Sequence, residues 1–195
     1  MPPELTADAL VQLVHRFYPS GTRNDEPRYK ESEEGQRLTE VVLANEKPTQ
    51  AWKDFIQRLR GEFPDCSPWD TTIPRHDPCY GVRVSQPGFV TGDPRCEEVV
   101  CLLSQIAPVY ALYVSLTVNK GPGLPREGWL RFPPFPPEFQ ERETRLASLI
   151  ESTFGFTRLS NEVLFTPVPD LVPRTAHYGP GEAQLIDLLF TWHRW

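Results

Sequence analysis

Apolar residues recur at helical spacing in three segments of the N-terminal part of the chain. In the first segment a suitable N-cap, Thr6, precedes the positions i, i+3, i+4 and i+7, which are Leu10, Leu13, Val14 and Phe17. We expect a second helix to begin near Ser32, although Gly35 is a poor helix former. A third has Thr49 as its N-cap and Gly61 at its end, with an apolar face of Trp52, Phe55, Ile56 and Leu59.

The pattern changes to the two-residue alternation of β-strands in the middle of the chain. Val82 and Val84 indicate a first strand, and residues 99–103 and 109–118 form two longer apolar runs. A short connection that contains Pro108 joins the two runs. Neighbouring strands with a short connection are most simply antiparallel, so we expect that pairing here.

The C-terminal part combines both patterns. Residues 120–137 are predicted to form a loop and residues 138–154 a helix, with Gly155 after its end. Short strands are predicted around residues 156–159 and 163–166. The segment 183–195 is so rich in apolar residues that we expect it to pack in the core. Its spacing fits a helix or a strand equally well, and its Phe, Thr and Trp residues favour a strand.

Helices first, then strands, then a helix with further strands predict an α+β fold. We expect N-terminal amphipathic helices to pack on an antiparallel or mixed β-sheet in two layers. A chain of 195 residues is long enough for one domain with its own core. The expected domain spans residues 1–195, with a helical part at about 5–61 and a sheet-forming part at about 79–195.

Composition limits the classes of partner. The formal net charge of −6 argues against nucleic-acid binding, which requires clustered Lys and Arg. Residues 99–118 are uncharged and as long as a membrane span, but their second half alternates as a strand does, so no membrane association is expected. The first residues lack a secretory pattern, which favours a cytoplasmic protein whose four cysteines are reduced.

One loop contains a small group of residues that could perform chemistry. Cys66, His76 and Cys79 are possible zinc ligands, and a histidine near Cys79 could activate its thiol. Zinc sites usually combine two short ligand pairs, whereas this loop offers one. Since the chain also lacks the G-x-S-x-G, C-x-x-C and H-E-x-x-H motifs, we interpret it as non-catalytic and cofactor-free. A hydrolase or metalloenzyme centred on these three residues is the alternative.

Acidic and aromatic residues suggest a surface for a protein partner. The acidic stretch 25–34 and the pair at positions 97 and 98 could attract a cationic partner over long range. Trp69 lies in the long loop 63–78, and exposed tryptophans often dominate binding energy. The predicted contact residues are therefore Glu31, Glu33, Glu34, Trp69, Glu97 and Glu98.

The chain closes on Asp187, Leu188, Leu189, Phe190, Thr191, Trp192, His193, Arg194 and Trp195. With this end, its acidic and arginine-rich composition and its α+β pattern, it resembles the immunity proteins of bacterial contact-dependent toxin systems. The resemblance implies a cytoplasmic protein that binds one cognate toxin and blocks its active site or substrate groove. Such families diverge at their binding faces, so the resemblance assigns no residue. A subunit of a larger assembly is a further interpretation, and the oligomeric state stays open.

Overall fold

The computed structural model describes residues 5–44, 46–88, 94–118, 127–174 and 179–191. Its helices are α1 (Ala7–Val14), α2 (Pro27–Glu31), α3 (Glu33–Ala44), α4 (Gln50–Glu62), α5 (Pro137–Phe154), α6 (Asn161–Leu164) and α7 (Leu185–Leu189). Its strands are β1 (Pro68–Asp70), β2 (Cys79–Ser85), β3 (Arg95–Ser104), β4 (Val109–Val118), β5 (Glu127–Arg131) and β6 (Thr157–Arg158).

The fold class is α+β, as the sequence predicts. Five strands form an antiparallel sheet in the order β1-β2-β3-β4-β5, and the short β6 adds a parallel pair to the start of β4. The two apolar runs at 99–103 and 109–118 lie in β3 and β4, which are antiparallel neighbours as expected. Among the described residues, no helix has the length and apolar character needed to cross a membrane.

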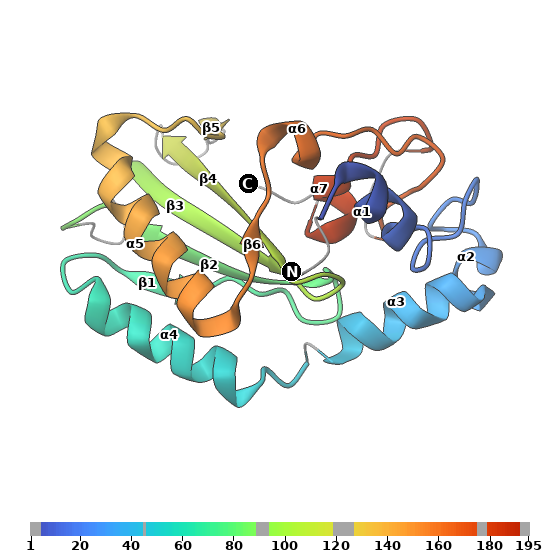
Figure 1. Cartoon of the computed structure of the whole chain (residues 1–195), viewed down its shortest axis with the longest axis horizontal. Coiled ribbons are helices and arrows are strands. Elements are labelled where there is room, and N and C mark those ends of the chain that lie inside the picture. Colours follow the sequence, from blue (N-terminus) through green and yellow to red (C-terminus); the bar gives the residue numbers. More distant parts are fainter. Residues whose placement is uncertain (1–4, 45, 89–93, 119–126, 175–178, 192–195) are drawn as a thin grey trace.

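Both faces of the sheet are covered. Successive side chains of a strand point to opposite sides, so each strand contributes residues to both faces. One face, here called the α4/α5 face, carries Val99, Cys101 and Leu103 of β3 and packs against α4 and α5. The other, here called the α1/α7 face, carries Val100 and Leu102 and packs against α1 and α7. In Figure 1 the two pairs of helices lie on different sides of the molecule. The sequence predicted two layers, and the helices on the second face of the sheet add a third.

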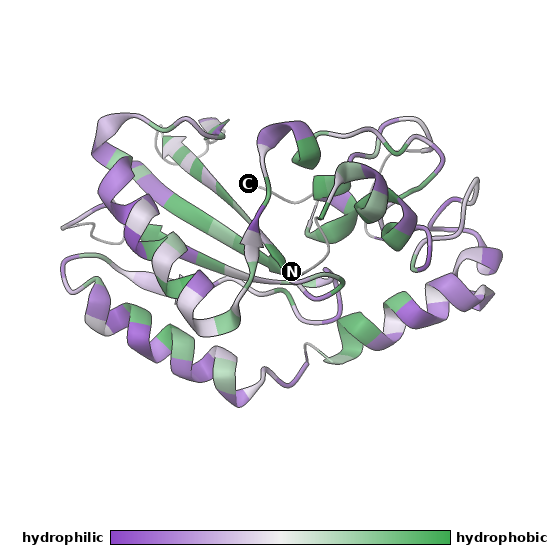
Figure 2. Ribbon diagram, in the orientation of Figure 1, coloured by the Kyte–Doolittle hydropathy of each residue, from purple (hydrophilic) through white to green (hydrophobic). Residues whose placement is uncertain are grey.

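The α4/α5 face is covered by helices that pack through aromatic rings. Trp52 of α4 stacks on Tyr80 of β2 with ring centroids 4.7 Å apart, and Phe55 meets Phe154 edge to face at 5.1 Å. Figure 2 shows hydrophobic and hydrophilic bands alternating along α4 and α5, whereas β3, β4 and α7 are mostly hydrophobic. Amphipathic helices of this kind bury one stripe and leave the other to solvent.

The α1/α7 face has a less regular cover, joined by hydrogen bonds between distant parts of the chain. The buried Tyr18 hydroxyl donates to the Leu188 carbonyl at 2.7 Å, and the Tyr29 hydroxyl donates to the Val172 carbonyl at 2.9 Å. The Gly21 N–H donates to the Asp170 carbonyl at 2.7 Å. These bonds fix the N-terminal part of the chain against α7 and the loop that precedes it.

Local signals for helix ends are largely confirmed. The hydroxyl oxygens of Thr6 and Thr49 accept N-cap hydrogen bonds from α1 and α4, and Gly155 follows α5 with a left-handed φ of 66°. Gly61 is wrong as an end signal, because it lies inside α4. Gly35 lies in α3 where a Cβ would come within 1.9 Å of the Tyr29 carbonyl oxygen, so the close approach of α2 requires glycine there.

Four sequence predictions are wrong. The predicted long loop 63–78 contains β1, and the predicted loop 120–137 contains β5 in its described part. Helix α2, anchored by the buried Tyr29, is an element for which the sequence made no prediction. Residues 161–164 form α6 where a strand was expected at 163–166. In the segment 183–195, for which a strand was favoured, residues 185–189 form the helix α7; positions 192–195 lie outside the described residues. All five residues of α7 are buried, so its apolar spacing could not reveal a helical face.

Candidate partner-binding surface

Trp69 is the exposed aromatic residue of the edge strand β1. Within the part of the chain that the structure describes, the strand pairs only with β2, and Trp69 stands opposite Arg83 in that register. About half of the side chain is exposed, 48%, yet the indole Nε1 donates to Glu98 Oε1 of β3 at 3.0 Å. Trp69 therefore combines a large open surface with a fixed orientation.

A buried ion pair holds the acceptor of this bond in place. Arg83 NH1 donates to Glu98 Oε2 at 2.8 Å, and the two side chains are only 13% and 8% exposed. Both carboxylate oxygens of Glu98 are thus used, one by the guanidinium and one by the indole. Charge-assisted hydrogen bonds of this kind are roughly twice as strong as neutral ones, so the carboxylate has little freedom to turn. We call Trp69 with Arg83 and Glu98 the Trp69 surface.

A second tryptophan fixes β1 to the helix on the other side of the sheet. Trp52 Nε1 of α4 donates to Asp70 Oδ2 at 2.8 Å, while Asp70 Oδ1 accepts from the Thr72 N–H at 2.9 Å. Neighbouring residues of β1 are therefore bound on opposite faces. A three-residue edge strand has few ladder bonds of its own, and these side-chain bonds compensate for that shortness.

The predicted acidic pair at positions 97 and 98 is divided between the two faces. Glu98 lies on the α1/α7 side and is only 6% exposed, so its prediction as an exposed acidic contact is wrong. Glu97 points to the α4/α5 side, where it forms an ion pair with Arg95. Consecutive strand residues alternate in direction, which is why two adjacent acids do not form one patch.

The other predicted acids lie at a distance from Trp69. Glu31 ends α2, and Glu33 and Glu34 begin α3; Figure 1 shows these helices at the opposite end of the molecule from β1. Glu33 pairs with Arg37 at 2.9 Å, an exposed i,i+4 contact. In the part of the chain that the structure describes, Glu31 and Glu34 form no ion pair. The structure therefore separates the predicted contacts into two regions.

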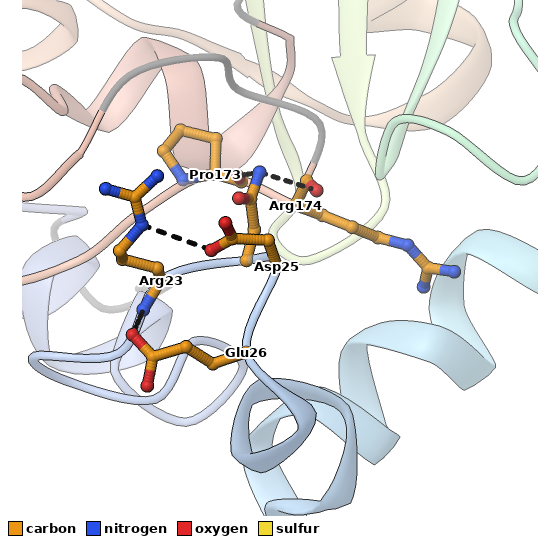
Figure 3. A network of polar contacts seen from close by, with 6 residues as sticks. Arg23, Asp25, Glu26, Pro173 and Arg174 are labelled. Atoms are coloured by element: carbon orange, nitrogen blue, oxygen red, sulfur yellow. Dashed lines mark hydrogen bonds and ion pairs between the residues drawn. The ribbon is translucent and has the colours of Figure 1, made fainter.

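The loop before these acids is ordered by polar contacts, as Figure 3 shows. Arg23 Nε donates to Asp25 Oδ1 at 3.1 Å, and this bond lowers the pKa of Asp25. The Arg23 N–H donates to Glu26 Oε1, also at 3.1 Å. Asn24 Nδ2 reaches the carbonyl oxygens of Pro173 and Arg174 at 3.2 and 3.1 Å. Part of the negative charge of this stretch is thus compensated locally.

The alternative site at Cys66, His76 and Cys79 is not assembled. Cys66 packs beside the α4/α5 cluster, Cys79 belongs to the α1/α7 cluster and His76 is exposed. Burial raises the pKa of the Cys79 thiol well above its usual value, which disfavours the thiolate that a nucleophile or metal ligand requires. Among the described residues, no group of three His, Cys, Asp or Glu side chains is placed to hold a metal ion.

Two important residues were missed by sequence reasoning. Arg83 lies between Val82 and Val84, and a charged residue at the centre of an apolar strand indicates a specific partner, a signal that could have been used. Its pairing with Glu98 depends on the register between β2 and β3, which one sequence does not reveal. Trp129, 51% exposed on the other edge strand, lies in what looked like a loop.

No protein-family model, no curated protein and no solved structure matches the chain. What the protein does must therefore be inferred from the placement of its own residues.

Proposed function

We propose that this is a non-catalytic binding protein that neutralises a cognate protein toxin by binding it through the Trp69 surface. The observation that carries the proposal is the arrangement of Trp69, half exposed while its indole N–H is bound by a buried ion pair. The resemblance to bacterial immunity proteins supplies the class of partner.

Pre-organisation makes Trp69 suited to binding. Ordering a flexible side chain at an interface costs about 0.5–1.5 kcal/mol, and a side chain that is already fixed avoids much of that cost. Tryptophan is also enriched among the residues that dominate interface energies, because it buries a large rigid surface. A partner that covers Trp69 would gain this area without disturbing the indole bond to Glu98.

Charge favours a basic partner, because the chain carries a formal net charge of −6. Glu31 and Glu34 lie too far from Trp69 to share a small interface, so their expected contribution is long-range attraction. Attraction of this kind raises the association rate and weakens as salt is added, whereas contact at Trp69 governs dissociation.

The first test is co-purification of the tagged protein with the product of each neighbouring gene, followed by growth assays of cells that express the captured product. We expect one product to form a stable complex and to lose its toxicity in the presence of this protein. If no neighbouring product is captured, or if the captured product stays toxic, the proposal is wrong.

The second test places the contact on the molecule. Trp69→Ala should weaken the complex by at least about tenfold, in line with the loss of an interface tryptophan. Trp129→Ala is the matched control, since it removes an equally exposed tryptophan from the other edge of the sheet. Urea unfolding of both variants checks that the fold is retained. Equal affinities for the two variants would remove Trp69 from the interface.

A further inference from the structure

The edge strand β5 is open to pairing in a way that β1 is not. It spans Glu127–Arg131 and is the last strand of the sheet, and among the described residues it pairs with β4 alone. β1, at the other edge, has three residues and begins with Pro68, which has no N–H to donate. Short length and proline are devices that protect an edge from other chains, and β5 has neither.

The sequence of β5 is complementary to itself when reversed. If two copies lie antiparallel and centred on Trp129, Glu127 of each copy stands opposite Arg131 of the other. Opposite charges placed across an antiparallel pair stabilise it, and like charges destabilise it. Gly128 then stands opposite Leu130, so a large side chain meets an open position. Each pairing occurs twice because of the two-fold symmetry.

The exposed side chains of β5 are those that such a pair would cover. Trp129 is 51% exposed and lies beside Leu116 of β4 in the ladder. Within the described part of the chain its indole donates no hydrogen bond, in contrast to that of Trp69. Arg131 is exposed and forms no ion pair with any described residue. A cross-strand pair of tryptophans would bury both rings against Leu116 of each copy.

We infer that β5 is a self-association edge: two copies of the chain pair antiparallel through Glu127–Arg131 and extend their sheets into one. The occupant is a second copy rather than an unrelated strand, since the charges at both ends of β5 fit its own reversed sequence. Five residues make a small interface, below the roughly 1,600 Å² of a standard stable complex. The dimer should therefore dissociate in the micromolar range or above.

The test is sedimentation velocity of the full chain from about 1 μM to about 500 μM, a range that spans the expected dissociation constant. The wild-type protein should shift from monomer to dimer. Arg131→Glu should weaken the dimer at least about tenfold, because each substituted side chain would face Glu127 of the other copy. Glu127 also has an interaction within its own chain, so Arg131 is the primary position and Glu127→Arg the second.

Mixing the two single variants separates pairing from damage to the fold. Arg131→Glu and Glu127→Arg each place like charges together in a homodimer, but a one-to-one mixture restores opposite charges at both ends of β5. We expect dimers in the mixture and monomers in each variant alone. A wild-type chain that stays monomeric at the highest concentration, or a mixture that behaves as its components do, would overturn the inference. The Trp69 surface is at the other edge, so this outcome is independent of the proposed function.

Discussion

On the α4/α5 face the sheet is covered by two long helices whose aromatic rings pack together, whereas on the α1/α7 face short helices and loops are joined by hydrogen bonds between remote segments. The Tyr18 and Tyr29 bonds on the second face span 170 and 143 residues of sequence. The buried ion pair of Arg83 and Glu98 is also on that side. Polar bonds also occur on the α4/α5 face, where the Tyr110 hydroxyl donates to Glu151 Oε1 at 2.6 Å, but they join segments that are nearer in sequence. One face therefore combines aromatic packing with bonds of shorter reach, and the other depends on polar bonds between remote segments, which tolerate little change.

The largest difference is expected between two adjacent acids of β3. Glu98→Ala leaves the guanidinium of Arg83 buried without its partner, which typically costs about 3–5 kcal/mol of unfolding free energy. Glu97→Ala removes the ion pair with Arg95, whose side chain is 64% exposed, and should cost less than about 1 kcal/mol. Urea unfolding measures both values. Equal losses would mean that the two faces do not differ in this respect.

Two glycine-to-alanine substitutions, one among the helices on each face of the sheet, should change the free energy of unfolding in opposite directions. Gly35→Ala places a Cβ against the Tyr29 carbonyl oxygen, and relieving that overlap should cost about 1–3 kcal/mol. Gly61→Ala in α4 meets nothing within 4 Å, so the better helix propensity of alanine should stabilise the protein by about 0.5 kcal/mol. Thermal unfolding of the two variants decides the matter: a destabilised Gly61→Ala or a neutral Gly35→Ala contradicts the assigned packing.

The smallest effect is a pH dependence confined to the α1/α7 cover. Burial alone would lower the pKa of His15, but its bonds to the Val11 carbonyl and the Asp170 carboxylate outweigh burial and raise the pKa above 6.5. Burial would likewise raise the pKa of Asp170, yet the hydrogen bonds from His15 and Ser20 lower it below 3.8. Both ring nitrogens of His15 face acceptors, which requires the charged imidazolium.

A raised histidine pKa stabilises the fold fully below the unfolded value of about 6.5, and this contribution is lost as pH rises through the native pKa. The Asp170 contribution is present above about pH 4 and is lost as pH falls through its lowered pKa. Between about pH 6 and pH 8, the wild type should therefore lose more stability than His15→Gln, by less than about 1 kcal/mol because the pair is partly exposed. Parallel urea profiles for the two proteins would show that His15 carries no such linkage.

The elements that could be predicted from the sequence are those with a local pattern of their own. Helix α4 has a cap at Thr49 and a clear apolar stripe, and β4 alternates, so local patterns identify both. Helix α7 is buried all round, and β5 becomes a strand through its ladder with β4, so neither carries a distinctive pattern. Elements that depend on tertiary contacts are beyond single-sequence reasoning.

The candidate site could likewise be predicted only in part, since the sequence identifies Trp69 but not the residues that hold it. Trp69 could be selected because a tryptophan in a long polar loop is unusual. Its bond to Glu98, and the burial of that carboxylate by Arg83, depend on the register of three strands. Two acids adjacent in sequence suggested one patch, and only the strand itself shows that Glu97 and Glu98 point apart.

The most direct test of the proposed function is a calorimetric titration of the captured partner with the wild-type protein, Trp69→Ala and Trp129→Ala. We predict one partner per chain, an affinity at least about tenfold weaker for Trp69→Ala, and an unchanged affinity for Trp129→Ala. An unchanged affinity for Trp69→Ala, in a variant that still folds, would contradict the assignment of the Trp69 surface as the binding site.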